Sequence, residues 1–172
     1  PSVMAFSDSP LHLTGQQWQR LIKYTGGAVT VLDDGWLRLL AGEARPAEGD
    51  ILLSLADWLA GRNVVHSGRV GVWLGAGDDL EQIADALGEL PVIGIEFGHF
   101  SDGRGYSIAR LLRDRYGFSG ELRALGDIQR DQLFYLHAVG FDAFSVRPED
   151  QPDAIATGLR DFSATYGRRG WQ

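Results

Sequence analysis

The spacing of apolar residues divides the chain into two parts, and the pattern changes near residue 50. In the first part, residues 15–24 place their apolar side chains on one face. They follow Thr14, whose Thr-x-x-Gln spacing is typical of a helix cap, so we predict a short N-terminal helix. The apolar runs AVTVL (28–32) and WLRLL (36–40) flank an Asp-Asp-Gly turn and predict a β-hairpin.

After residue 50, short apolar runs alternate with amphipathic stretches that end at glycines. The predicted strands are residues 51–55, 69–74, 91–97, 121–126 and 142–147. The predicted helices are residues 56–62, 78–87, 106–116, 128–139 and a last one from residue 152. This alternation is typical of βα units joined by right-handed crossovers, and it predicts a parallel sheet.

These patterns predict the α/β fold class. We expect a mostly parallel five-stranded sheet of βα units, preceded by the N-terminal helix and hairpin. Five strands are too few to close a barrel, which leaves an open three-layer sandwich or a half-barrel. We expect one domain over residues 1–172, with the arm, helix and hairpin in 1–45 and the βα-unit core in 46–168.

Charge and composition narrow the classes of partner and cofactor. The net charge of −7 argues against nucleic acid or an anionic membrane as the main partner. The absence of cysteine excludes disulfides, iron–sulfur clusters, zinc–thiolate sites and thiol redox chemistry. Electron transfer would therefore need an outside cofactor such as flavin, and the sequence identifies none. No apolar run reaches the roughly 18–20 residues of a membrane span, and the start lacks signal-peptide features, so we expect a cytoplasmic protein.

Polar residues gather where the predicted strands end, which is the ligand-binding edge of a parallel sheet. Our candidate anion- or ligand-binding residues lie after the third, fourth and fifth of these strands: Glu96, Asp102, Gly103, Arg104, Gly105, Asp127, Arg130, Asp131 and Arg147. Catalytic roles are not assigned to any of them. The histidines are scattered without ligand spacing, so no metal site is expected.

Two of the turns at this edge have a functional and a structural interpretation. In SDGRGYS (101–107), the glycines, the helix-start amides and the Arg104 guanidinium suit sulfite, phosphate or carboxylate. The alternative is that Asp102 or Ser101 caps the helix and the glycines only permit a tight turn. In the turn 126–131, Asp127 is either a helix cap beside a surface ion pair or the second half of the same site.

Two further features also have alternatives. Arg123 lies in the middle of a predicted central strand, so its charge needs a partner. Glu96 is the expected one, unless both residues form the floor of a polar pocket. An aromatic group indicates either a homodimer interface or core packing, and its members are Phe97, Phe100, Phe134, Tyr135, Phe141 and Phe144.

Several runs of the chain resemble one known family. They are LADWL (55–59), GVWL (71–74), SDGRGYSIARLLRDRYGFSGELRALGD (101–127), RDQLFYL (130–136) and GFDAF (140–144). From about residue 50 to 166 the chain resembles the bacterial family catalogued as domain of unknown function 934. Its members are described as oxidoreductases of sulfite reduction and are encoded beside sulfite reductase.

The resemblance implies an accessory protein of assimilatory sulfite reduction with sulfite reductase as its partner. The alternatives are a small-anion-binding α/β enzyme and a flavin-dependent redox partner in sulfur assimilation. The resemblance carries over no catalytic residues.

Overall fold

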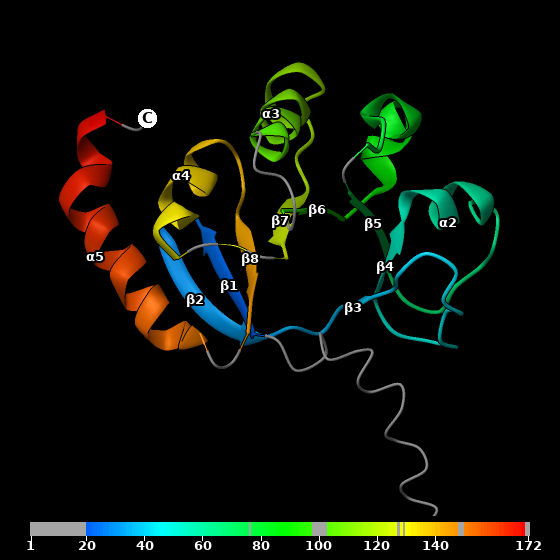
Figure 1. Cartoon of the computed structure of the whole chain (residues 1–172), viewed down its shortest axis with the longest axis horizontal. Helices are drawn as coiled ribbons and strands as arrows, with labels where there is room; N and C mark the ends of the chain where they lie inside the picture. Colours follow the sequence, from blue (N-terminus) through cyan, green and yellow to red (C-terminus); the bar gives the residue numbers. More distant parts are fainter. Residues whose placement is uncertain are drawn as a thin grey trace, which may run out of the picture.

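The computed structural model describes residues 20–75, 77–97, 103–126, 128, 130–147 and 150–170 (Figure 1). Its strands are β1 (Arg20–Thr25), β2 (Ala28–Asp33), β3 (Leu37–Arg38), β4 (Ile51–Ser54), β5 (Val70–Leu74), β6 (Val92–Glu96), β7 (Glu121–Leu125) and β8 (Ala143–Val146). Its α-helices are α2 (Leu55–Ala60), α3 (Arg104–Arg110), α4 (Leu133–Ala138) and α5 (Pro152–Gly170). Helical segments of other types are η2 (Leu80–Glu89), η3 (Leu111–Arg115) and η4 (Arg130–Gln132).

The predicted N-terminal helix is wrong where it can be checked, because Arg20–Thr25 forms strand β1. This strand pairs antiparallel with β2 on one side and with β8 on the other. Gly26 and Gly27, at φ of 60° and 82°, form the two-residue turn between β1 and β2, a backbone that matches the twist of a hairpin. The expected helical residues before Arg20 lie outside the described residues.

The predicted hairpin between residues 28–32 and 36–40 is also wrong. Strand β2 pairs with β1, whereas β3 pairs in parallel with β4 at the other edge of the sheet. The Asp-Asp-Gly segment does not reverse the chain, because Asp34 turns inward. Its carboxylate accepts a hydrogen bond from the Trp36 amide at 3.0 Å and pairs with Arg123 at 2.7 Å.

One eight-stranded sheet, in the order β2-β1-β8-β7-β6-β5-β4-β3, replaces the expected five-stranded one. The five predicted strands are β4 to β8, which run parallel as expected. Strand β3 joins them in parallel, and the β1–β2 hairpin adds two antiparallel strands.

The connection between β2 and β3 requires this sheet to curl. Asp33 ends β2 and Leu37 begins β3, so four Cα–Cα steps of about 3.8 Å span at most about 15 Å. In a flat sheet with strands about 4.8 Å apart, the two edge strands would lie about 34 Å from each other. The sheet is therefore a curled half-barrel, one of the two expected architectures.

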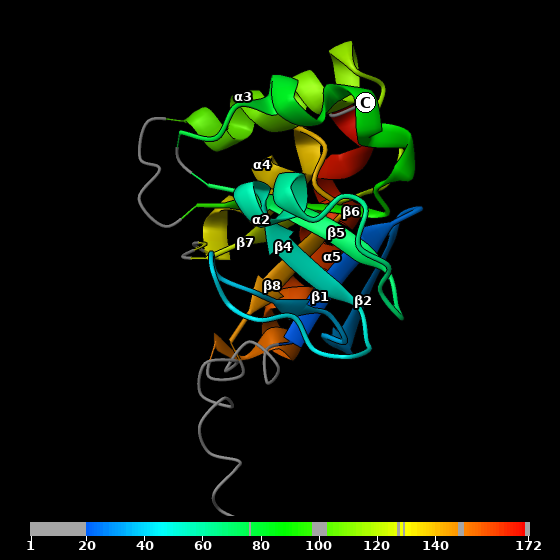
Figure 2. The same ribbon diagram turned by 90° about the vertical axis from the view of Figure 1, so that its right-hand side faces the viewer.

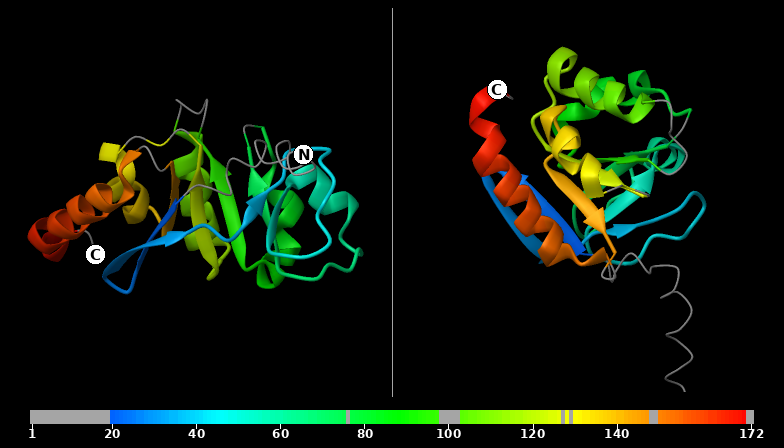
Figure 3. Two further views of the ribbon diagram at one scale, coloured as in Figure 1. Left: turned by 90° about the horizontal axis from the view of Figure 1, so that it is seen from below. Right: turned by 60° about the vertical axis from the view of Figure 1, so that its left-hand side comes forward.

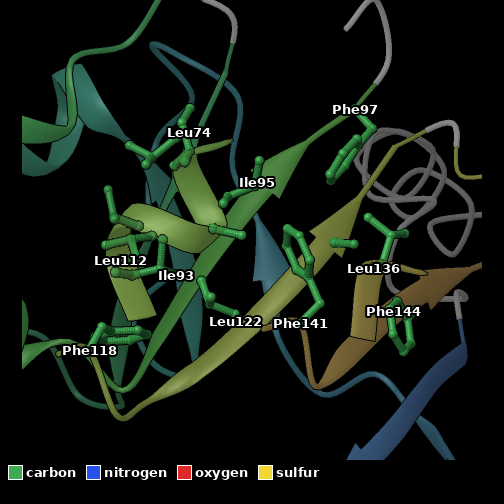
Figure 4. Close-up of a cluster of buried hydrophobic side chains, with 14 of the residues drawn as sticks. Leu74, Ile93, Ile95, Phe97, Leu112, Phe118, Leu122, Leu136, Phe141 and Phe144 are labelled. Carbon is green, nitrogen blue, oxygen red and sulfur yellow. The ribbon is translucent and has the colours of Figure 1, made fainter. Parts of the chain in front are cut away.

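The helices lie outside the curl, as Figures 1 and 2 show. Between them and the sheet lies the main hydrophobic core, which includes Leu74, Ile93, Ile95, Phe97, Leu112, Phe118, Leu122, Leu136, Phe141 and Phe144 (Figure 4). Helix α5 packs along the β1–β2 hairpin (Figure 3). There the Arg160 guanidinium donates to the Val29 carbonyl at 2.7 and 3.1 Å and so caps part of the exposed sheet edge.

The helices after residue 50 follow the predicted positions with local differences. Asp79 caps η2, since its carboxylate accepts a hydrogen bond from the Glu81 amide at 3.0 Å. The Asp78 carboxylate instead accepts from the Gly75 amide at 2.7 Å and closes the turn after β5.

A small second cluster occupies the opposite, concave face of the sheet. Trp36, Leu52 and Val92 are buried there and Trp73 packs against them. Alternation along the strands explains the division, because neighbouring residues such as Leu53 and Val72 belong to the main core. The inner face therefore presents two tryptophans together with the charged side chains described below.

Candidate functional site

The parallel strands β4 to β8 end at one edge of the sheet, where the candidate residues were expected. Glu96 is the last residue of β6, and Arg147 directly follows β8. Gly103 and Gly105 lie at the start of α3, while Arg130 and Asp131 begin η4. Asp102 and Asp127 lie outside the described residues.

Glu96 is bound by an arginine from the far edge of the sheet. The Arg38 guanidinium of β3 lies 2.8 Å from a Glu96 carboxylate oxygen and 4.2 Å from the centre of the Trp73 ring. The Trp73 indole N–H donates to the Leu39 carbonyl at 2.8 Å, which fixes the ring under the guanidinium. Two strands separate β3 from β6, so the curl of the sheet makes this contact possible.

Arg38 is a residue that the sequence reasoning missed. Its side chain is mostly buried, and its Nε atom has no hydrogen-bond partner in the part of the chain that the structure describes. A signal was present, since a single charged residue within the apolar run WLRLL (36–40) predicts a buried, paired charge. The same reasoning identified Arg123.

In the turn before α3, the backbone conformation accounts for Gly103 and close packing accounts for Gly105. Gly103 adopts a left-handed conformation with φ of 79°, and no side chain among the described residues caps α3. The Gly103 carbonyl accepts hydrogen bonds from the amides of Tyr106 and Ser107 at 3.1 and 3.2 Å. A Cβ atom on Gly105 would lie 2.6 Å from the Phe97 ring, so Gly105 allows α3 to pack closely on that ring.

Asp131 is the described residue that connects the second turn to the first. Burial raises the pKa of the Tyr106 hydroxyl, and the Asp131 carboxylate raises it further. At the end of β8, Arg147 makes a solvent-exposed ion pair with Asp150 at 3.1 Å.

The predicted Glu96–Arg123 pair is wrong, although β6 and β7 are neighbours. Arg123 lies opposite Gly94 in the register, and Glu96 lies two residues farther along, within reach of Arg38. Arg123, whose side chain is only 1% exposed, binds Asp34 at 2.7 Å and Glu121 at 2.8 Å. The Lys23 ammonium also contacts Glu121 at 3.1 Å, so this network joins β1, β7 and the β2–β3 connection.

The aromatic group divides between the core and the surface. Phe97, Phe134, Phe141 and Phe144 are buried, as the core interpretation predicts. Tyr135 is 54% exposed, and Phe100 lies outside the described residues.

Tyr135 borders an open groove between α4 and α5. The groove has a volume of about 530 Å³ and is lined by Asp131, Phe134, Tyr135, Ala154, Ile155, Gly158, Leu159 and Phe162. The Phe134 and Phe162 rings contact each other in it, with centres 4.3 Å apart and planes tilted by 48°. We call it the α4–α5 groove.

The geometry thus offers ion-paired charges at the strand ends and an apolar groove beside them. Within the described ranges, no group of three histidine, aspartate or glutamate side chains is placed to hold a metal ion. No helix found in those ranges combines the length and the apolar character needed to cross a bilayer.

A comparison with protein-family models gives one match. The model described as "Bacterial protein of unknown function (DUF934)" matches residues 71–171, which is more than half of the 172-residue chain. The chain belongs to this DUF934 family. The matched region contains both strand-end turns and the α4–α5 groove of this DUF934 protein, whereas Arg38 lies before it. No match was found among curated proteins or among solved structures.

Proposed function

We propose that this DUF934 protein is an accessory protein of assimilatory sulfite reduction that binds sulfite reductase through the α4–α5 groove. The observation that carries the proposal is the groove itself, an open and largely apolar depression with a half-exposed tyrosine at its border. Aromatic side chains in such depressions are typical anchors of protein–protein interfaces. The choice of partner rests on the family resemblance.

The charged edge of the sheet gives less support to a catalytic role. Glu96 is bound by Arg38, and Arg147 by Asp150. Gly105 provides space for the Phe97 ring rather than for a ligand. A catalytic site needs groups positioned around a reacting atom, whereas Glu96 and Arg147 are each bound by a neighbouring charged side chain.

The absence of cysteine agrees with an accessory role in a redox pathway. A protein without thiols has no side chain suited to thiol–disulfide exchange or to iron–sulfur ligation. Electron transfer would then use the cofactors of the partner, while this chain contributes binding and orientation. This chain would have the same binding and orienting role if it and sulfite reductase also used a flavin.

The test is the binding of the purified chain to its cognate sulfite reductase, measured by biolayer interferometry. We expect a dissociation constant in the micromolar range or below. Replacing Gly158 by glutamate places a charged side chain into the groove at a helix position where a Cβ meets no atom within 4 Å. We expect Gly158→Glu and Tyr135→Ala each to weaken binding by about 10-fold or more.

Gly88→Glu is the matched control, because Gly88 in η2 is equally open and lies away from the α4–α5 groove. It introduces the same charge and should leave the dissociation constant unchanged. If the wild-type chain does not bind sulfite reductase at micromolar concentration, the proposed partner is wrong. If it binds and Gly158→Glu has no more effect than Gly88→Glu, the groove is not the interface.

A further inference from the structure

A second cavity, of about 460 Å³, lies at the opposite end of the strands. Val70, the first residue of β5, and Pro91, which precedes β6, both border it. The full lining is Arg45, Leu53, Trp58, Gly61, Arg62, Val64, Arg69, Val70, Gly88, Glu89, Leu90 and Pro91. The cavity shares no residue with the α4–α5 groove or with the predicted binding edge.

Three of the lining side chains are arginines, and one is a carboxylate, Glu89. Arg62 has a carboxylate partner in Asp85 at 3.5 Å, and Arg69 has one in Asp50 at 2.8 Å. Arg45 has no hydrogen bond or ion pair within the part of the chain described by the structure. The three arginines are thus balanced by the carboxylates of Glu89, Asp85 and Asp50, and the feature that can bind an anion is the Arg45 guanidinium, which has no partner among the described residues.

The position of the Arg45 guanidinium depends on a glycine. Its Nη2 atom lies 2.7 Å from where a Cβ atom of Gly61 would be, so the guanidinium occupies space that a side chain would fill. Gly61 ends α2 at φ of −112°, a backbone conformation open to any residue, and so the backbone does not require glycine there. The close approach of the Arg45 guanidinium is therefore the feature that favours glycine at position 61.

The remaining wall of the cavity is apolar. Leu53, Leu90 and Pro91 contribute aliphatic surface, and the Trp58 ring lies beneath the Arg62 guanidinium at 4.5 Å. A volume of this size falls within the range of small-molecule sites, about 300–1,000 Å³. The cavity therefore combines a cationic anchor with room for a small apolar body.

We propose that this cavity binds a small organic molecule that carries an oxyanion group, either a phosphate or a carboxylate, with Arg45 as its anchor. Guanidinium groups bind both oxyanions through two parallel hydrogen bonds. The apolar wall contacts the organic part of the molecule, so the site favours an organic oxyanion over the inorganic ion. The site is separate from the proposed sulfite reductase interface.

The test is isothermal titration of the full chain with phenyl phosphate, benzoate, inorganic phosphate and benzyl alcohol. We expect saturable binding of phenyl phosphate or benzoate, weaker binding of inorganic phosphate and none of benzyl alcohol. The stronger of the two organic anions identifies the oxyanion. Arg45→Ala removes a charged donor and should weaken binding about 10-fold or more. Arg110→Ala is the control, since Arg110 is an exposed arginine on α3 and should not affect binding.

Gly61→Ala is the second variant, because it keeps every charge but displaces the Arg45 guanidinium. We expect it to weaken binding as Arg45→Ala does while the thermal unfolding midpoint stays near that of the wild type. Three results would overturn the proposal. They are no saturable binding of either organic anion to the wild type, equal affinity in Arg45→Ala, and equal loss in Arg110→Ala.

Discussion

Asp142 shows how one carboxyl group makes the free energy of unfolding depend on pH. Burial raises the pKa of its carboxyl, although the Leu122 amide and the Arg113 guanidinium favour the charged form. A raised pKa in the folded state means that the native protein holds the proton more tightly, so this residue destabilises the fold increasingly as pH rises through that pKa.

We therefore expect Asp142→Asn to increase the free energy of unfolding at pH 7. At pH values below the unfolded pKa of 3.8 the gain should disappear, because the wild-type carboxyl is then neutral in both states. The asparagine oxygen can still accept from the Leu122 amide. Arg113 keeps its hydrogen bonds to the carbonyls of Phe118, Gly120 and Gly140. Urea unfolding between pH 3.5 and 7 measures the effect.

Asp50→Asn is the control with the opposite sign. Hydrogen bonds from Arg69 lower the pKa of the Asp50 carboxyl, so its charged form stabilises the fold at pH 7 and that stabilisation is lost as pH falls through the lowered pKa. Asp50→Asn should therefore reduce the free energy of unfolding at pH 7. A loss of stability at pH 7 in Asp142→Asn as well would contradict the assignment for Asp142.

The sequence indicates which buried charged side chains need an ion-pair partner, but it does not identify that partner. The position of Arg123 inside an apolar strand correctly predicted a buried, paired charge. Its partner Asp34 is far away in the sequence, in a segment whose pattern predicts a turn. Glu96, the expected partner, binds Arg38 instead. Pairing across a curled sheet depends on its curvature, which the sequence of a single strand does not contain.

At the scale of elements, the β1–β2 turn depends on the conformations of its two glycines. Gly26 and Gly27 both have positive φ, and a Cβ on either would meet no atom within 4 Å. An alanine at either position would therefore be strained by its backbone and not by packing. We expect Gly26→Ala and Gly27→Ala each to lower the free energy of unfolding by about 1–2 kcal/mol, measured by urea unfolding.

Gly158→Ala in α5 is the matched control for this prediction. Gly158 is equally open but is inside a helix without positive φ, where alanine is the better residue. The same substitution should stabilise the protein by about 0.5–1 kcal/mol. If alanine changes the free energy of unfolding in the same direction at the turn and in the helix, the sign of φ does not decide its effect on stability.

The elements after residue 50 could be predicted from the sequence because their apolar runs are short, regular and separated by glycines. Strand β1 could not, since Leu21 and Ile22 are both buried although they point to opposite faces of the sheet. A strand buried on both faces loses its alternation, and the same residues also fit one face of a helix. Pairing with β2 and β8, which is non-local information, decides the conformation.

At the scale of the whole molecule, the short β2–β3 connection makes an open sheet into a half-barrel. The sequence predicted five parallel strands and could not decide between a sandwich and a half-barrel. That choice depends on which strands become the edges. With β2 and β3 at opposite edges and only Asp34–Trp36 between them, the connection crosses the concave face and places Trp36 inside it.

Arg123 fixes this crossing, because its guanidinium binds Asp34 of the connection and Glu121 of β7 in a buried network. Replacing it by methionine fills much of the same volume but leaves the buried Asp34 carboxylate without its charged partner, whereas Glu121 keeps its contact with Lys23. Breaking a buried ion pair by removing one side costs about 3–5 kcal/mol, and we expect Arg123→Met to lower the free energy of unfolding by that amount. Chemical denaturation measures it. Arg110→Met, at an exposed pair, should change stability by about 1 kcal/mol or less.

A double variant distinguishes loss of the charge network from loss of packing. Adding Asp34→Asn to Arg123→Met removes the unpaired charge while it keeps the shape of the side chain, and Glu121 stays unchanged because it still contacts Lys23. It should recover part of the lost stability, because neutral amides are less costly to bury than unpaired carboxylates. If Arg123→Met costs no more than Arg110→Met, the network does not fix the crossing. The packing of Trp36 against Leu52 and Val92 would then be the interaction that holds the connection inside the curl.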